Sequence, residues 1–103
     1  MTKESASKIY KALGEPNRLK IIKLLINNGE ICACKLLEIV NCRQSTLSHH
    51  LSKLEECGLL RSRREKKNIF YSCDKVVLNE AMSFLTDVCD ECAKIKDDVS
   101  EKE

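Results

Sequence analysis

Apolar residues recur every three or four positions along most of the chain, a spacing typical of helices that bury one face. Gly14, Gly29 and Gly58 are placed to end helices, and Pro16 suits a first helical turn. The pattern predicts four successive helices, over residues 5–13, 16–28, 32–40 and 44–57. The second helix is apolar on nearly every side, so we expect it to form the buried centre of the fold.

The third and fourth predicted helices are short and are separated by only three residues, which is the arrangement of a helix-turn-helix. Leu47, Leu51 and Leu54 give the fourth helix an apolar face at helical spacing. Polar residues occupy its opposite face: Gln44, Ser45, Ser48, His49 and Lys53. We therefore expect the leucines to pack on the core and the polar face to remain free for a partner.

The period changes from helical to alternating at residues 59–73, which predicts two strands joined by a tight turn. The expected turn, residues 65–68, contains no glycine, so Asn68 is the residue expected to adopt a positive φ. The hairpin is strongly basic, with Arg61, Arg63, Arg64, Lys66 and Lys67.

A last helix is predicted over residues 75–96, with Asp74 as its N-cap. Its apolar positions alternate in steps of three and four, as in a coiled-coil seam: Leu78, Ala81, Leu85, Val88, Cys92, Ile95 and Val99. Since no later segment can cover this seam, the pattern predicts a homodimer through the terminal helices, with folding back on the chain's own core as the alternative. Residues 1–96 then form one domain and residues 97–103 a charged, flexible tail.

The chain has 103 residues, enough for one small domain. No apolar run reaches membrane-spanning length and no secretion signal is visible, so we expect a cytoplasmic protein without membrane contact. Its seven cysteines are then expected to be reduced thiols. Residues 1–73 carry 14 Lys and Arg against 7 Asp and Glu, whereas residues 74–103 carry 4 against 9. This asymmetry indicates a polyanionic partner for the first part.

Four segments, in order along the chain, carry a resemblance to a known family: KALGEPNRLKIIKLL, EICACKLL, QSTLSHHLSKLEECGLL and RSRREKKNIFYSC. They resemble the opening segment, the Cys-x-Cys segment, the recognition helix and the wing of the ArsR/SmtB metal-sensing transcriptional repressors. The likeness covers nearly the whole chain, from about residue 9 to residue 92. It implies a mainly α winged helix-turn-helix with a small β-hairpin, homodimeric through its terminal helices. It also implies binding to double-stranded operator DNA with an inverted repeat.

The polar face of the fourth helix supplies the predicted base contacts, because a recognition helix enters the major groove by its N-terminal end. We expect Gln44, Ser45 and Thr46 at that end, followed by Ser48, His49 and Lys53 one turn on. For Thr46 and for the neighbouring His50, packing within the domain is an equal alternative. Phosphate contacts are expected from about half of the basic hairpin residues, Arg61, Arg63, Arg64, Lys66 and Lys67.

Cys32 and Cys34 are the first predicted metal ligands, because thiolates bind soft ions. Side chains two apart on a regular helix diverge by about 200°, so the pair can share an ion only if Cys32 lies ahead of the helix or the first turn is distorted. The Cys-x-Cys segment resembles that of arsenic, cadmium and lead sensors. The expected inducer is therefore As(III) or Sb(III), with Cd, Pb or Zn as further possibilities, and its binding is expected to release DNA.

The third ligand is not identified by the sequence. Position 37, from which arsenic sensors often take it, is Leu37, and residues 1–31 contain no cysteine. Cys89 and Cys92 are three residues apart on the last predicted helix, so they are either a second ligand pair or part of the dimer seam. That helix contains no histidine, which disfavours the zinc site that other members of this family carry there.

Three alternatives remain at this stage. A repressor of the same fold can respond to oxidation or persulfides, for which Cys89 and Cys92 are the better placed pair. A thiol oxidoreductase using the Cys-x-x-Cys of residues 89–92 is disfavoured, because such motifs open a helix after a strand. A winged-helix module that binds only protein is disfavoured by the basic hairpin. No catalytic constellation is visible, so we predict that the chain is not an enzyme.

Overall fold

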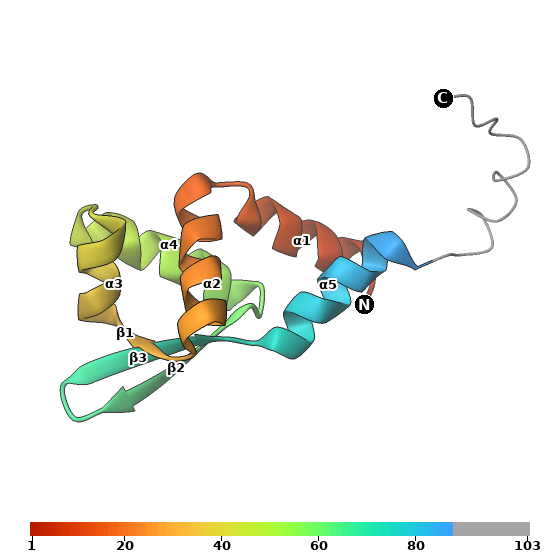
Figure 1. Ribbon diagram of the computed structural model, residues 1–103. Helices are drawn as coiled ribbons and strands as arrows, with labels where there is room; N and C mark the ends of the chain where they lie inside the picture. The colour runs from red at the N-terminus through yellow and green to blue at the C-terminus, as the bar shows by residue number, and fades with distance from the viewer. Residues whose placement is uncertain (88–103) are drawn as a thin grey trace, which may run out of the picture.

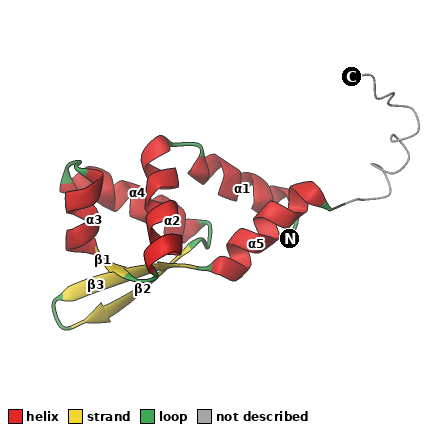
Figure 2. Cartoon of the chain, viewed as in Figure 1, coloured by secondary structure: helices red, strands yellow, loops and turns green. Residues whose placement is uncertain are grey.

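The computed structural model describes residues 1–87, and all structural statements below refer to them. It contains five helices and a three-stranded antiparallel sheet (Figures 1 and 2). The helices are α1 (Lys3–Leu13), α2 (Pro16–Asn28), α3 (Ala33–Val40), α4 (Gln44–Glu56) and α5 (Lys75–Thr86). The strands are β1 (Ile31–Cys32), β2 (Leu60–Glu65) and β3 (Asn68–Cys73). No helix within this range is long and apolar enough to cross a membrane.

Local sequence signals account for most helix boundaries. Thr2 caps α1 by accepting a hydrogen bond from the backbone N–H of Ser5, and Pro16 opens α2 as predicted. The left-handed φ of Gly29 ends α2, and that of Gly58 follows the end of α4. Gly14 also follows a helix, but its φ of −75° shows that the expected left-handed glycine cap is not used there.

The core lies between α1, α2, α3 and α4, and the first residues of β2 and the base of α5 close it. Its largest fully buried side chains are Ile9, Ile21, Leu25, Leu36, Leu54 and Leu59. The prediction that α2 is buried on nearly every side is wrong in part, because Leu19 and Ile26 are 53% and 38% exposed. The buried stripe of α2 is formed by Ile21, Ile22 and Leu25, which leaves its opposite face in solvent.

The sheet has the order β1-β3-β2. The hairpin turn falls at Lys66 and Lys67, because Glu65 and Asn68 are paired across the strands. Lys66, not Asn68, has the positive φ, at 58°. A two-residue hairpin loop places the unusual dihedral at a central position, and the register makes Asn68 a strand residue. β1 was not predicted, since a two-residue strand leaves no alternation in the sequence.

α5 is capped by Asp74, whose carboxylate accepts hydrogen bonds from the N–H groups of Val76 and Val77. The helix ends at Thr86, where the sequence predicted continuation to about residue 96. Packing, more than propensity, stabilises a helix of this length, and Leu85 beside this end is 71% exposed. The predicted tail at 97–103 and the later seam positions lie outside the described residues.

The predicted seam positions within α5 do not all face the same way: some pack inward and Leu85 is exposed. Ala81 is 1% exposed and Leu78 is partly buried, so both pack against the core of their own chain. The Tyr10 hydroxyl donates a hydrogen bond to the carbonyl of Ala81 and so joins α1 to α5. The expectation that Ala81 pairs with a second subunit is therefore wrong, and the alternative of folding back holds for this position, whereas Leu78 keeps part of its surface exposed.

His50 is buried within the domain, so its alternative role in packing is the one the structure shows. Its Nδ1 accepts a hydrogen bond of 3.1 Å from Nε of Arg18, and its Nε2 lies 3.7 Å from a carboxylate oxygen of Glu15. His50 thereby attaches α4 to the first turn of α2 and fixes the rotation of α4 against the core.

We expect His50→Ala to lower the free energy of unfolding by about 1–3 kcal/mol, because it leaves the part-buried Arg18 guanidinium without this acceptor. Urea denaturation followed by circular dichroism measures the loss. His49→Ala is the matched control, since His49 is exposed on the neighbouring position and its replacement should change stability by less than about 0.5 kcal/mol. Equal stability of the two variants would contradict the role given to His50.

Candidate functional site

The polar face of α4 is exposed along its first two turns. Gln44, Ser45, Thr46, Ser48 and His49 all face solvent, while the leucines of the same helix are buried. For Thr46 this excludes burial in the domain, its alternative role. α4 follows α3 after three residues, and Asn41 in the left-handed conformation makes the turn. The structure thus presents the N-terminal end of α4 as a free hydrogen-bonding surface.

Lys53 lies further along α4 and is 47% exposed, with its ammonium 3.9 Å from a carboxylate oxygen of Glu56. An exposed pair of this kind contributes little to stability. The lysine is therefore free to exchange this partner for a phosphate.

The five basic residues of the hairpin fall into two groups. Arg61 is bound by Asp74, with its Nη2 and Nε at 2.8 and 2.9 Å from the same carboxylate oxygen, which lowers the pKa of Asp74. Arg63 is held by Glu30 and Glu65. Arg64, Lys66 and Lys67 are exposed and form no ion pair within residues 1–87, so they are the cations available at the tip.

Cys32 and Cys34 are brought together despite their spacing. Cys32 has an extended backbone, φ −76° and ψ 153°, and is the N-cap of α3 and not part of its first turn. Its Sγ lies 2.7 Å from Sγ of Cys34, which is exposed. The pair therefore meets the condition that the sequence set for a shared ligand, that Cys32 lies ahead of the helix.

The contact between the two sulfurs affects the two thiols in opposite directions. It lowers the pKa of Cys32, together with a hydrogen bond from the backbone N–H of Lys35. The same contact and desolvation raise the pKa of Cys34. The structure therefore places two free thiols of unequal pKa side by side at the start of α3.

No third protein ligand joins this pair within the described part of the chain, where no group of three His, Cys, Asp or Glu side chains can hold a metal ion. Cys42, Cys57 and Cys73 are half-buried against the core. Burial raises the pKa of Cys57 and Cys73, as expected for packed thiols. Cys89 and Cys92, the other predicted ligands, lie outside the described residues.

Glu30 is a residue of this region that the sequence did not single out. Its carboxylate receives two hydrogen bonds from the guanidinium of Arg63, at 2.7 and 2.9 Å, and Arg63 lowers the pKa of this carboxyl group. Glu30 and Arg63 belong to two separate motif segments and are 33 positions apart. They are brought together by the pairing of β1 with β3 and of β3 with β2, so nothing in the sequence pattern predicted the contact.

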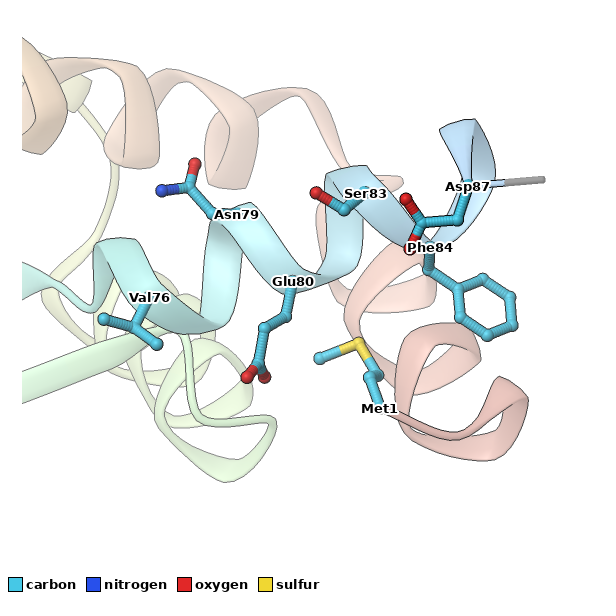
Figure 3. Close-up of a pocket in the computed structure, with 7 residues that line it drawn as sticks. All are labelled: Met1, Val76, Asn79, Glu80, Ser83, Phe84 and Asp87. Atoms are coloured by element: carbon cyan, nitrogen blue, oxygen red, sulfur yellow. The ribbon is translucent and has the colours of Figure 1, made fainter. Parts of the chain in front are cut away.

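α5 and the N-terminus leave apolar side chains in solvent. An open pocket between them is lined by Met1, Val76, Asn79, Glu80, Ser83, Phe84 and Asp87 (Figure 3). Of these, Val76 is 67% exposed and Met1 45%, and Met82 and Leu85 on the same helix are 56% and 71% exposed. This concentration of exposed apolar surface at one end of a small domain is typical of an interaction surface.

A helix-turn-helix followed by a basic two-stranded wing defines the winged helix-turn-helix class of DNA-binding proteins. Residues 15–62 match the family described as bacterial regulatory protein, arsR family. The chain is also 35% identical to the arsenical resistance operon repressor of Staphylococcus aureus over 85 residues, 82% of this chain and 81% of that protein. It belongs to the ArsR family of transcriptional regulators.

Further relatives agree with this assignment. An uncharacterised HTH-type transcriptional regulator of Methanocaldococcus jannaschii is 43% identical over 69% of this chain and 81% of its own length. A homologue of the cadmium resistance regulatory protein CadC of Staphylococcus aureus is 38% identical over 66% of this chain, which spans only 56% of that relative.

Solved structures show the same fold. HlyU from Vibrio cholerae is 29% identical with a TM-score of 0.69, covering 80% of this chain and 89% of that one. The homodimeric winged helix-turn-helix domain Mb0332 of Mycobacterium bovis is 25% identical with a TM-score of 0.68, covering 81% and 77%. The matched family and the sequence relatives are transcriptional regulators, and this chain is accordingly a regulator and not an enzyme.

Proposed function

We propose that the protein is a cytoplasmic homodimeric repressor, released from its operator when a thiophilic metal or metalloid binds Cys32 and Cys34. The observation that carries this proposal is the position of the thiol pair. Cys32 is at once the N-cap of α3 and a residue of β1, which pairs with β3 of the wing. A ligand that moves Cys32 therefore acts on both elements that frame the DNA-reading surface.

The exposed start of α4 supports major-groove readout. Gln44 can pair bidentately with adenine, and Ser45, Thr46 and Ser48 can donate to or accept from either class of base. His49 and Lys53 follow on the same face, within reach of bases or phosphates. In a homodimer, two such helices spaced by about 34 Å, one turn of duplex, select an inverted repeat.

The homodimer is supported by the exposed apolar side chains of α5, because they have no cover within the described chain. Mb0332, of similar fold, is homodimeric. We therefore retain the pairing of terminal helices as a proposal. The dimer contacts are now assigned to the outward face of α5, which carries Val76, Met82 and Leu85, and not to the positions that pack inward.

As(III) or Sb(III) is the proposed inducer. Two sulfurs are in place, both ions prefer sulfur ligands, and one relative is an arsenical resistance operon repressor. Cd and Pb are the next candidates, since another relative is a cadmium resistance regulator, and Zn follows them. Within residues 1–87 of one chain, no third side chain joins the pair. A further ligand therefore comes from the rest of the chain, from a second subunit or from solvent. Cys89 and Cys92 remain proposed ligands for this reason.

Ligand binding has a physical reason to change the site. Both thiols must lose their protons, since only the thiolate is a ligand. Cys32 is the N-cap of α3 and Cys34 lies in its first turn, so a ligand that repositions the two sulfurs acts on the start of α3, and α3 supports α4.

A panel of ions tests this proposal. A duplex selected from random sequence by the protein itself serves as the probe, and release is followed by fluorescence anisotropy. We expect arsenite or antimonite to release the duplex at stoichiometric concentration, with cadmium and lead next and zinc last. If none of these ions changes the anisotropy in reducing buffer, the proposed inducer class is wrong.

Wing contacts make a separate prediction. Lys67→Ala should weaken binding to all duplex sequences alike. It should also make the negative slope of log K against log salt shallower by about 1.8 for the dimer, which is about 0.9 for each lost phosphate contact. Anisotropy titrations at salt concentrations from about 50 to about 300 mM measure this slope. Lys23→Ala, an exposed lysine of α2, is the control and should leave it unchanged. The same slope in Lys67→Ala and wild type would remove the wing tip from the interface.

Oxidation is the second candidate signal, and one observation favours it. The structure brings the free thiols of Cys32 and Cys34 into contact, although residues two apart in sequence are poor disulfide partners on a regular helix. Two thiols form a disulfide by giving two electrons and two protons to an oxidant such as peroxide or a polysulfide. Peroxide-dependent release that a reductant reverses, in the absence of any metal, would favour this reading over metal sensing.

A further inference from the structure

The outer face of the sheet carries a continuous row of side chains that starts at the thiol pair. In the register, Cys32 is opposite Phe70, and Phe70 is opposite Arg63. Directly opposite residues of neighbouring strands project from the same face. The guanidinium carbon of Arg63 lies 4.8 Å from the centre of the Phe70 ring, so the last two members of the row are in contact.

Glu30 connects the far end of this row, Arg63, back to the chain segment that carries Cys32. It lies two residues before Cys32, and both of its carboxylate oxygens accept hydrogen bonds from Arg63. Arg63 also reaches Glu65 at 3.0 Å, next to the turn of the hairpin. A bidentate carboxylate fixes both the position and the plane of a guanidinium, unlike a single contact. Arg63 of the wing is thus held by Glu30, which lies two residues before Cys32.

We propose that Glu30 is a positioning residue that transmits occupancy of the Cys32–Cys34 site to the wing through Arg63. The inference rests on the proposed function, because it names how the proposed ligand acts. When Cys32 moves, Glu30 moves with it, because Glu30 immediately precedes the two-residue strand β1. The ion pair of Glu30 with Arg63, here called the clasp, then moves Arg63 and β2. The wing and the recognition helix then leave their DNA-binding arrangement together.

The clasp is not needed for stability or for ligand binding. The side chain of Arg63 is 50% exposed and that of Glu30 37%, and exposed ion pairs contribute little to folding. Glu30 forms no hydrogen bond with either thiol. Its removal should therefore uncouple two events that both still occur, ligand binding and operator binding.

Glu30→Gln is the test, in the full chain. Glu38→Gln is the matched control, because Glu38 is an exposed carboxylate on α3 that, among residues 1–87, pairs only with Lys35, at 3.6 Å. Three quantities are measured for each variant and for wild type: arsenite affinity, operator affinity with and without arsenite, and hydrogen exchange of the wing amides with and without arsenite. We expect wild type and Glu38→Gln to lose operator affinity by about 5- to 150-fold on binding arsenite, the usual range of allosteric coupling.

In Glu30→Gln we expect the arsenite-induced loss of operator affinity to be smaller than in wild type by a factor of about three or more, on the order of what one charged contact supplies to coupling. Arsenite affinity and arsenite-free operator binding should be retained, and arsenite should no longer change the exchange of the wing amides. Full coupling and an unchanged wing response in Glu30→Gln would overturn the role of Glu30 and leave the proposed function intact.

A wild-type protein that binds arsenite without releasing the operator would instead overturn the proposed function. The exchange experiment still decides the inference in that case: an arsenite response of the wing that Glu30→Gln abolishes supports it, and any other result overturns it. A protein that binds no arsenite contradicts both.

Discussion

Cys34→Ser is expected to bind the operator as wild type does and to lose its response to arsenite and cadmium. Cys34 is exposed and supplies one of the only two thiols that the described structure brings together, so its loss leaves Cys32 as a single sulfur. One thiolate does not hold these ions at the concentrations at which a pair does, because chelation supplies most of the affinity. Anisotropy of the operator complex at increasing arsenite measures the response.

Cys42→Ser is the control for this variant. Cys42 is half-buried in the turn between α3 and α4 and packs against the core, away from the thiol pair. Its response to arsenite should match that of wild type. Full arsenite and cadmium responses in Cys34→Ser would show that the ligand acts elsewhere in the chain.

The second large effect is expected at the start of α4. Gln44→Ala should cost about 1–3 kcal/mol in operator binding for each base that the side chain reads, because a bidentate amide–adenine contact is lost. The preference for the correct base at that position should relax. Binding to random duplex should be nearly unchanged, since it depends on phosphate contacts.

Lys53→Ala is the contrasting variant, because Lys53 lies later on α4 and its charge suits a phosphate. It should weaken specific and random duplex alike and leave base preference intact. The measurement is a competition titration against operators with single base-pair changes. If Gln44→Ala weakens all duplexes equally, α4 does not read bases through Gln44.

Much of the fold followed from periodicity and from strong local signals. Pro16, Asp74 and the left-handed Gly29 act where the sequence placed them, because capping is decided by residues next to one another. The turn residue was predicted wrongly at Asn68, because side-chain preference alone does not give the register of a hairpin. The division of the α5 seam could not be predicted either, since it depends on how α5 lies on α1 (Figure 1).

The site shows the same division between local and tertiary information. The thiol pair was visible in the sequence, together with the requirement that Cys32 precede the helix, and its backbone meets that requirement. The link from β1 to the wing was not visible, because it needs strand pairing between residues about forty positions apart. The role proposed for Glu30 depends on that pairing and on the pairing of β3 with β2, so the sequence offered no reason to choose it.

The central claim is that a thiophilic ligand on Cys32 and Cys34 releases the DNA. Its most direct test is the anisotropy of the wild-type operator complex titrated with arsenite in a buffer that contains a phosphine reductant, followed by an excess of a small dithiol. We predict that arsenite lowers the anisotropy to the value of free duplex and that the dithiol restores it by removing the arsenic. Anisotropy that stays constant throughout would contradict the claim.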